Sequence, residues 1–131
     1  MSKVKIKSDL RDVSLLIVED GEDIINIMDR TFKMLVNDIT LAKDGQEAID
    51  AFNNSKPDAI LTDLRMPNVN GIEFIKHVRA TDKTIPIIMI TAYEHDLIHE
   101  DKELINEVFP KPINFMKLVV SLDEQIQASK K

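Results

Sequence analysis

Short apolar runs alternate along this chain with longer segments that have helical periodicity. The apolar runs lie at residues 13–18, 39–42, 59–62, 85–90 and 107–110. Runs of roughly four to eight apolar residues between turn residues are typical of strands buried on both faces. The segments that follow them repeat apolar residues at intervals of three and four, which predicts amphipathic helices. Five strands that each lead into a helix predict an α/β fold in which helices cover both faces of a parallel sheet.

The predicted helices differ in regularity. The first begins near Glu22, and its stripe of apolar positions includes Ile24, Met28 and Met34. We expect the methionines of such stripes, Met116 in the last helix among them, to lie in the core. The segment 94–106 is the least regular helix, because acidic residues interrupt its apolar positions.

The same pattern sets the expected domain limits. Residues 1–12 are polar and charged, and we expect an N-terminal arm there, followed by one domain at residues 13–128. Since Pro110 cannot donate a hydrogen bond inside a sheet, the fifth strand is expected at an edge.

Composition narrows the possible functions. The 131 residues include no cysteine, which excludes disulfides and cysteine-bound metals. A net charge of −6 disfavours nucleic-acid binding, and the three glycines form no dinucleotide-binding pattern. Without an apolar run long enough to span a membrane, we expect a cytoplasmic protein that does not bind membranes.

Polar residues follow four of the predicted strands. Glu19 and Asp20 follow the first strand, Asp63 the third, and Lys111 the fifth, while Thr91 ends the fourth. The carboxyl ends of parallel strands lie along one edge of a sheet, where α/β folds bind ligands. We therefore expect these five side chains to lie close together.

This set of residues favours phosphoryl transfer assisted by Mg²⁺. Three converging carboxylates repel one another, and a hard cation with oxygen ligands relieves that repulsion. A hydroxyl and an ammonium opposite the carboxylates would bind phosphoryl oxygens, with Asp63 as the nucleophile. His95 and His99 have metal-ligand spacing, but a solvated helix face explains them better, since no third ligand is evident.

These residues resemble the receiver domains of two-component response regulators. The resemblance rests on an ordered set of motifs: Glu19-Asp20, Asp63 with Met66-Pro67 and Asn70-Gly71, Thr91-Ala92, and Lys111-Pro112. It implies a flavodoxin-like, doubly wound sheet with strand order 2-1-3-4-5. It also implies that Asp63 accepts phosphate from a sensor histidine kinase or a histidine phosphotransfer protein.

The resemblance assigns further roles within the site. Asp20, Asp63 and the backbone carbonyl of Arg65 would bind Mg²⁺ directly, and Glu19 would bind it mainly through water. Thr91 and Lys111 would hold the phosphoryl group, and the bond between Lys111 and Pro112 would be cis.

The chain departs from its family at the position three residues before Lys111. Receivers usually carry a Tyr or Phe switch there, whereas this chain has Val108. Phe109 should point to the opposite face of the strand. Tyr93 is the remaining aromatic candidate, so we expect signalling to depend on displacement of residues 93–106.

Two alternatives to a phosphorylation switch agree less well with the sequence. A pseudo-receiver would act only as an interaction module, but the complete acidic set disfavours it. A Mg²⁺-dependent phosphatase would need a second catalytic acid after its nucleophile, where this chain has Arg65. We therefore expect a regulatory phospho-acceptor that assists its own phosphorylation and dephosphorylation, and not an enzyme. Both a stand-alone receiver and one part of a longer regulator, whose effector is unknown, agree with the sequence.

Overall fold

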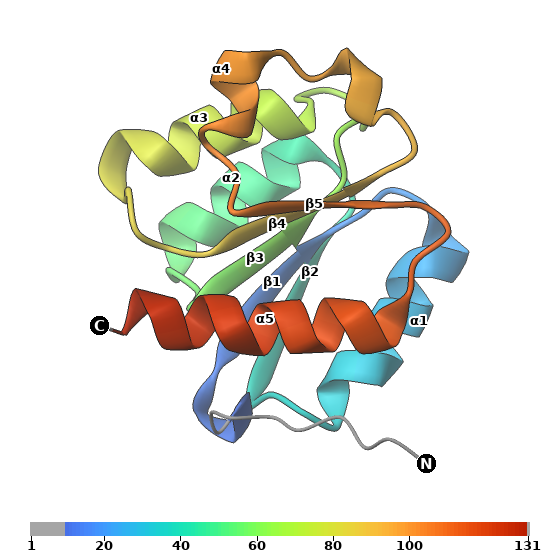
Figure 1. The fold of residues 1–131 in the computed structure, drawn as a ribbon, viewed down its shortest axis with the longest axis vertical. Coiled ribbons are helices and arrows are strands. Elements are labelled where there is room, and N and C mark those ends of the chain that lie inside the picture. The colour runs from blue at the N-terminus through green and yellow to red at the C-terminus, as the bar shows by residue number, and fades with distance from the viewer. Residues whose placement is uncertain (1–9, 131) are drawn as a thin grey trace.

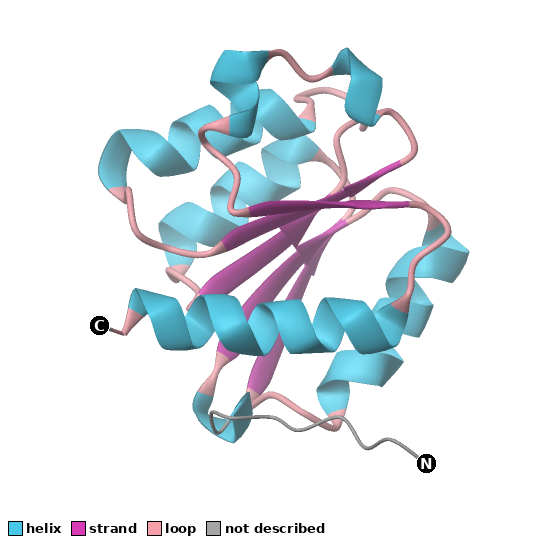
Figure 2. Cartoon of the chain, in the orientation of Figure 1, coloured by secondary structure: helices cyan, strands magenta, loops and turns pink. Residues whose placement is uncertain are grey.

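A computed structural model describes residues 10–130 of the chain, and strands and helices alternate along it as predicted (Figure 2). The strands are β1 (Ser14–Val18), β2 (Asp38–Ala42), β3 (Ala59–Thr62), β4 (Ile87–Thr91) and β5 (Glu107–Pro110). The α-helices are α1 (Glu22–Lys33), α2 (Gly45–Asn54), α3 (Gly71–Thr81), α4 (His99–Lys102) and α5 (Phe115–Ser129). The structure also contains two short 3₁₀ turns, η1 (Leu10–Asp12) and η2 (Glu94–Asp96).

The five strands form one parallel sheet in the order β2-β1-β3-β4-β5. This confirms the flavodoxin-like order and places β5, with Pro110, at an edge. The register pairs Val18 of β1 with Thr62 of β3, and Thr91 of β4 with Pro110 of β5. The residues that follow these strands are thereby brought to the same edge of the sheet.

The helices cover the sheet in two layers, with α1 and α5 on one face and α2, α3 and α4 on the other (Figure 1). Side chains alternate between the layers along each strand, as the two-residue period of a strand requires. On β1, Leu15 and Ile17 pack toward α1 and α5, whereas Leu16 and Val18 pack toward α2 and α3. Among residues 10–130, no helix is both long enough and apolar enough to cross a membrane.

The predicted N-terminal arm is wrong in its last residues. Residues 1–9 of that prediction lie outside the described part of the chain. Residues 10–12 form η1, and Leu10 is only 3% exposed because it packs in the core of the α1 and α5 layer. The packed domain therefore includes Leu10 and does not begin at Val13.

Two predicted core methionines are also wrong. Met28 is buried as expected, but Met34 is 87% exposed and Met116 is 58% exposed. Met34 lies just beyond the end of α1, where the helical period no longer fixes the direction of a side chain. Within α1 the buried residues are Ile25, Met28 and Phe32, and Ile24 is only partly buried.

The predicted helix at 94–106 is replaced by two short elements, η2 and the four-residue α4. Neither element contains a buried residue. Leu97 and Ile105 are buried, and they attach this part of the chain to the core. We call residues 93–106 the β4–β5 segment.

Candidate functional site

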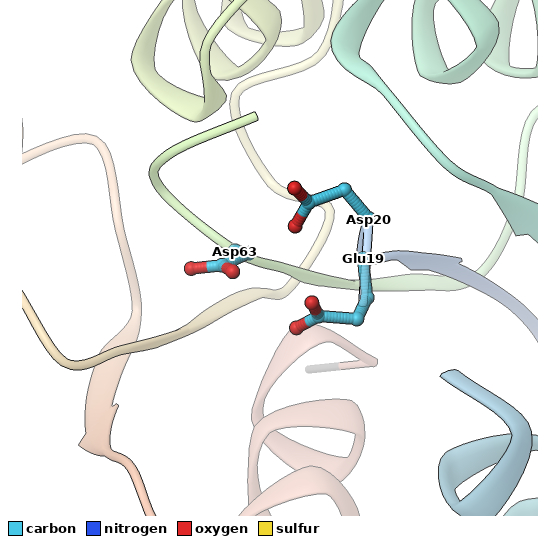
Figure 3. A group of neighbouring side chains, drawn as sticks. All are labelled: Glu19, Asp20 and Asp63. Atoms are coloured by element: carbon cyan, nitrogen blue, oxygen red, sulfur yellow. The ribbon is translucent and has the colours of Figure 1, made fainter. Parts of the chain in front are cut away.

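Three carboxylates meet at the carboxyl edge of the sheet. Glu19 and Asp20 follow β1, and Asp63 follows the neighbouring strand β3. One oxygen from each side chain lies within 4.8 Å of one oxygen from each of the others. Figure 3 shows the three carboxylates gathered at the end of the sheet. Glu19 and Asp63 are buried and Asp20 is exposed, so the cluster opens to solvent on the Asp20 side.

Backbone contacts fix Asp63 at the end of β3. Its amide donates to the Val18 carbonyl (3.0 Å), and its Oδ1 accepts from the Leu64 amide (2.7 Å). The Gly71 amide then donates to the Leu64 carbonyl (2.7 Å). A Cβ on Gly71 would lie 2.2 Å from the Asp63 carbonyl oxygen, so only glycine allows the start of α3 to approach this closely.

The far part of the same loop is held against α2. A Cβ on Gly45, at the start of α2, would lie 1.9 Å from the Val69 carbonyl oxygen. Asn68 adopts a left-handed conformation with φ 68°, which Asn tolerates better than most residues. Its amide donates to Asp44 (3.0 Å), the residue that caps α2. The loop after Asp63 is therefore fixed at both ends.

Lys111 links two of the carboxylates. Its Nζ donates to Glu19 Oε1 and to Asp63 Oδ2, each at 2.9 Å. The Lys111 amide donates to the Thr91 carbonyl, and the bond to Pro112 is cis, as predicted. Burial alone lowers the pKa of the Lys111 ammonium, but its hydrogen bonds to Asp63 and Glu19 outweigh burial and raise that pKa. Lys111 is therefore charged at neutral pH.

Glu19 lies on the buried side of the cluster. Burial is the largest influence on this carboxyl and raises its pKa, and the charge of Asp63 raises it further. Hydrogen bonds from Lys111 and from the Gly21 amide (2.8 Å) oppose this increase without cancelling it. The cluster contains three carboxylates and one ammonium, so negative charge is in excess. Every ligand atom that the carboxylates offer is an oxygen. This donor set fits a hard divalent cation such as Mg²⁺.

Thr91, the last predicted site residue, is buried at the end of β4. Its hydroxyl accepts a hydrogen bond from the Tyr93 amide at 2.9 Å. Val108 packs partly buried toward α2 and α3, and Phe109 packs in the opposite layer. This confirms that Val108 and Phe109 face opposite sides of the sheet.

The sequence did not reveal one cluster beside the site. Arg65 donates from Nε (3.1 Å) and Nη2 (2.5 Å) to Asp96 Oδ2, and its guanidinium carbon lies 3.6 Å from the centre of the Tyr93 ring. The hydrogen bonds with Asp96 raise the pKa of Arg65. Because Arg65 and Asp96 are 31 positions apart, no local pattern could have predicted their contact. His95 and His99 are exposed and lie beside acidic neighbours, as expected for solvated residues.

Comparisons with known proteins agree with this geometry. Residues 15–123 match the response regulator receiver domain family. The chain is 35% identical over 91 residues to sporulation initiation phosphotransferase F of Bacillus subtilis (strain 168), covering 69% of this chain and 73% of that protein. It is 34% identical over 80 residues to the response regulator MprA of Mycobacterium sp. (strain KMS) but spans only 35% of its length.

Solved structures give the same result. Response regulator TrrA from Thermotoga maritima, in complex with Mg²⁺-BeF, superposes with a TM-score of 0.79 at 26% identity, covering 86% of this chain and 98% of TrrA. The receiver domain of sensor histidine kinase PA1611 from Pseudomonas aeruginosa PAO1 superposes with a TM-score of 0.76 at 26% identity, covering 88% and 98%. That structure holds a magnesium ion in its active-site cleft.

Proposed function

The chain belongs to the receiver domain family of two-component response regulators, and on this basis we propose that Asp63 accepts a phosphoryl group in the presence of Mg²⁺. The observation that carries this proposal is the convergence of Glu19, Asp20 and Asp63 beside Lys111. The phosphoryl donor would be a sensor histidine kinase or a histidine phosphotransfer protein.

In the proposed reaction, a carboxylate oxygen of Asp63 attacks phosphorus in a phosphohistidine. A phosphorus–oxygen bond forms, the phosphorus–nitrogen bond breaks, and the released imidazole keeps the bonding electron pair and takes up a proton. Lys111 already lies 2.9 Å from Asp63, so its ammonium is placed to neutralise the phosphoryl oxygens. The Thr91 hydroxyl, at the end of the next strand, would donate to one of those oxygens.

The ligands proposed for Mg²⁺ are Asp20, Asp63 and the backbone carbonyl of Arg65, with Glu19 acting through water. When bound, the cation supplies positive charge for the phosphoryl group. The residues fit this role because their carboxylate oxygens converge and the site opens to solvent at Asp20.

We further propose that the domain is a regulatory phospho-acceptor and not an enzyme with a separate substrate. The same residues would assist its own phosphorylation and dephosphorylation. The acidic cluster offers no surface for nucleic-acid phosphates, so its proposed partners are the phosphoryl donor and a downstream protein.

Incubation with acetyl phosphate and Mg²⁺, followed by intact-mass measurement, tests the proposal. The wild-type chain should gain one phosphoryl group, whereas Asp63→Asn and a sample with EDTA should gain none. Asp50→Asn, an exposed substitution on α2, is the matched control and should label like wild type. Full labelling of Asp63→Asn at another residue would contradict the assignment. A wild-type chain that never labels would instead favour the phosphorylation-independent interaction module.

The variant Lys111→Ala tests the role of the Lys111 ammonium separately from that of the bound Mg²⁺. Since Lys111 contributes a charge and no metal ligand, this variant should still bind Mg²⁺, as titration calorimetry can measure. Its conformational response to phosphorylation should be impaired. Loss of Mg²⁺ binding in a folded Lys111→Ala protein would contradict the role assigned to Lys111.

A further inference from the structure

Arg65, Tyr93 and Asp96, which we call the Arg65 cluster, connect the two loops that flank the site. Arg65 lies two residues after Asp63, and Tyr93 lies two residues after Thr91. The Arg65 guanidinium contacts the Tyr93 ring at 3.6 Å and donates two hydrogen bonds to Asp96. Since Asp96 is the last residue of η2, the cluster reaches from the phospho-acceptor loop into the β4–β5 segment.

Outside this cluster, the β4–β5 segment is held mainly near its C-terminal end. Arg79 donates to the Leu104 carbonyl (3.0 Å) and to Asn106 Oδ1 (3.1 Å), and Asn106 exchanges hydrogen bonds with the Ile87 backbone. The segment's buried apolar side chains are Leu97 and Ile105, and α4 contributes none.

A groove of about 430 Å³ separates the segment from α3, with Ile72 and Lys76 on one side and Ile98 on the other. Arg65 and Asp96 both line this groove, so their hydrogen bonds connect its two sides.

A second contact ties the cluster to the site. The Tyr93 amide donates to the Thr91 hydroxyl at 2.9 Å, so the position of that hydroxyl helps to fix Tyr93. Thr91 is 1% exposed, and any reorientation of its hydroxyl must move or break this hydrogen bond. The loop after Asp63, in contrast, is fixed by its contacts with Gly71 and Gly45.

We propose that the Arg65 cluster couples the phosphoryl occupancy of Asp63 to the position of the β4–β5 segment. This inference rests on the proposed function. When Thr91 turns toward a phosphoryl group, the Tyr93 amide follows its hydroxyl, and the Tyr93 ring leaves the Arg65 guanidinium. Asp96 then loses its hydrogen bonds with Arg65, which hold η2 in place, and the β4–β5 segment moves. Tyr93 and Asp96 act as positioning residues, because neither touches the reacting atoms.

Tyr93 provides a direct probe, since the chain contains one tyrosine and no tryptophan. Its intrinsic fluorescence therefore reports on the contact with Arg65. In the wild-type protein, beryllofluoride with Mg²⁺ should change this emission. In Asp96→Asn, the emission should already be shifted toward the beryllofluoride-bound value, and adding beryllofluoride should produce a much smaller change.

Two further variants control for charge and for folding. Glu94→Gln removes an exposed carboxylate from the same 3₁₀ turn and should respond like wild type. Asp96→Glu keeps the carboxylate and should restore much of the response. All three variants should keep the far-ultraviolet circular dichroism and unfolding midpoint of wild type.

Intact mass, measured on the same proteins after acetyl phosphate treatment, separates failure of this inference from failure of the proposed function. If Asp63 is labelled and Asp96→Asn responds to beryllofluoride like wild type, the coupling is wrong and the phospho-acceptor role stands. If wild type takes up no phosphoryl group, both proposals are wrong. Normal labelling of Asp96→Asn with a lost Tyr93 response supports the coupling.

Discussion

The two β–α connections that flank the site differ sharply in how they are held. After β3, the loop packs backbone against backbone at Gly71 and Gly45 and leads into the 11-residue α3. After β4, the chain forms only η2 and the four-residue α4, neither with a buried residue. The first connection is held by close backbone packing, whereas the second is held by two buried side chains and by hydrogen bonds from Arg65 and Arg79. Figure 1 shows how short α4 is next to the longer α3.

This difference matches the roles proposed for the two connections. A phospho-acceptor must keep its position relative to the other site residues, because small displacements weaken the stabilisation of a reacting group. A reporter of phosphorylation must move, and mobile elements come from the parts of a fold with low local stability. Strand β4 connects a fixed region to a movable one. It begins after the loop at residues 82–85, which Asp82 holds by accepting hydrogen bonds from the Thr84 and Ile85 amides. It ends at the β4–β5 segment.

The largest expected effect is in α3, the helix that follows the fixed loop after β3. Phe74 in α3 is fully buried, so Phe74→Ala should lower the free energy of unfolding by about 3–5 kcal/mol. Urea denaturation followed by circular dichroism measures this loss. A loss below about 1 kcal/mol would mean that α3 is packed no better than the β4–β5 segment, and the comparison would fail.

The sheet and its strand ends were easier to predict from the sequence than the β4–β5 segment. The strands, the edge position of β5 and the residues of the acidic cluster were predictable, because buried runs and strand ends leave strong local patterns. The strand order was predicted from the family resemblance alone. The segment 94–106 retained a helical period at Leu97 and Ile105, yet a few buried residues cannot support a long helix in water. The contact of Arg65 with Asp96 joins positions far apart in sequence, and Leu10 looked like part of a polar arm. Both depend on tertiary packing and not on local pattern.

The second prediction concerns the loop that holds the beginning of β4. Asp82 is 7% exposed, pairs with Lys56, and accepts hydrogen bonds from the amides of Thr84 (2.8 Å) and Ile85 (2.9 Å). Burial alone raises the pKa of Asp82, but the Lys56 contact and these amides lower it well below its ordinary value of 3.8. Asp82→Asn should therefore lower the free energy of unfolding at neutral pH by about 1.5–3 kcal/mol.

The pH dependence of this effect follows from the sign of the pKa shift. A carboxyl whose pKa is lowered by folding stabilises the protein above its unfolded pKa and loses that contribution as pH falls through the folded value. The stability gap between wild type and Asp82→Asn should therefore narrow as pH falls below 3.8. Glu124→Gln, an exposed substitution on α5, should show no such gap. A gap that is constant down to strong acid would contradict the proposed contacts of ionised Asp82.

The third prediction concerns Leu97, a buried residue that attaches the β4–β5 segment to the core. Leu97 is 7% exposed, and a buried Leu→Ala substitution commonly costs about 2–5 kcal/mol. In Leu97→Ala we expect a global loss of only about 1–2 kcal/mol, because the loss cannot exceed the free energy of opening the β4–β5 segment alone. Amide exchange should accelerate across residues 93–106 and stay unchanged in α3. Equal acceleration in both regions would show that they unfold together.

The smallest expected effect is at the next residue. Ile98 is 58% exposed on the groove beside α3, so Ile98→Ala should change the free energy of unfolding by less than about 0.5 kcal/mol. It should also leave amide exchange in the β4–β5 segment close to that of wild type. Leu97 and Ile98 are adjacent and differ mainly in burial, so this pair separates the effect of packing from that of local sequence. If Ile98→Ala were as destabilising as Leu97→Ala, the groove would be closed in solution, and the segment would pack against α3 along its length. The β4–β5 segment would then lack the freedom to move that the coupling through Arg65 requires.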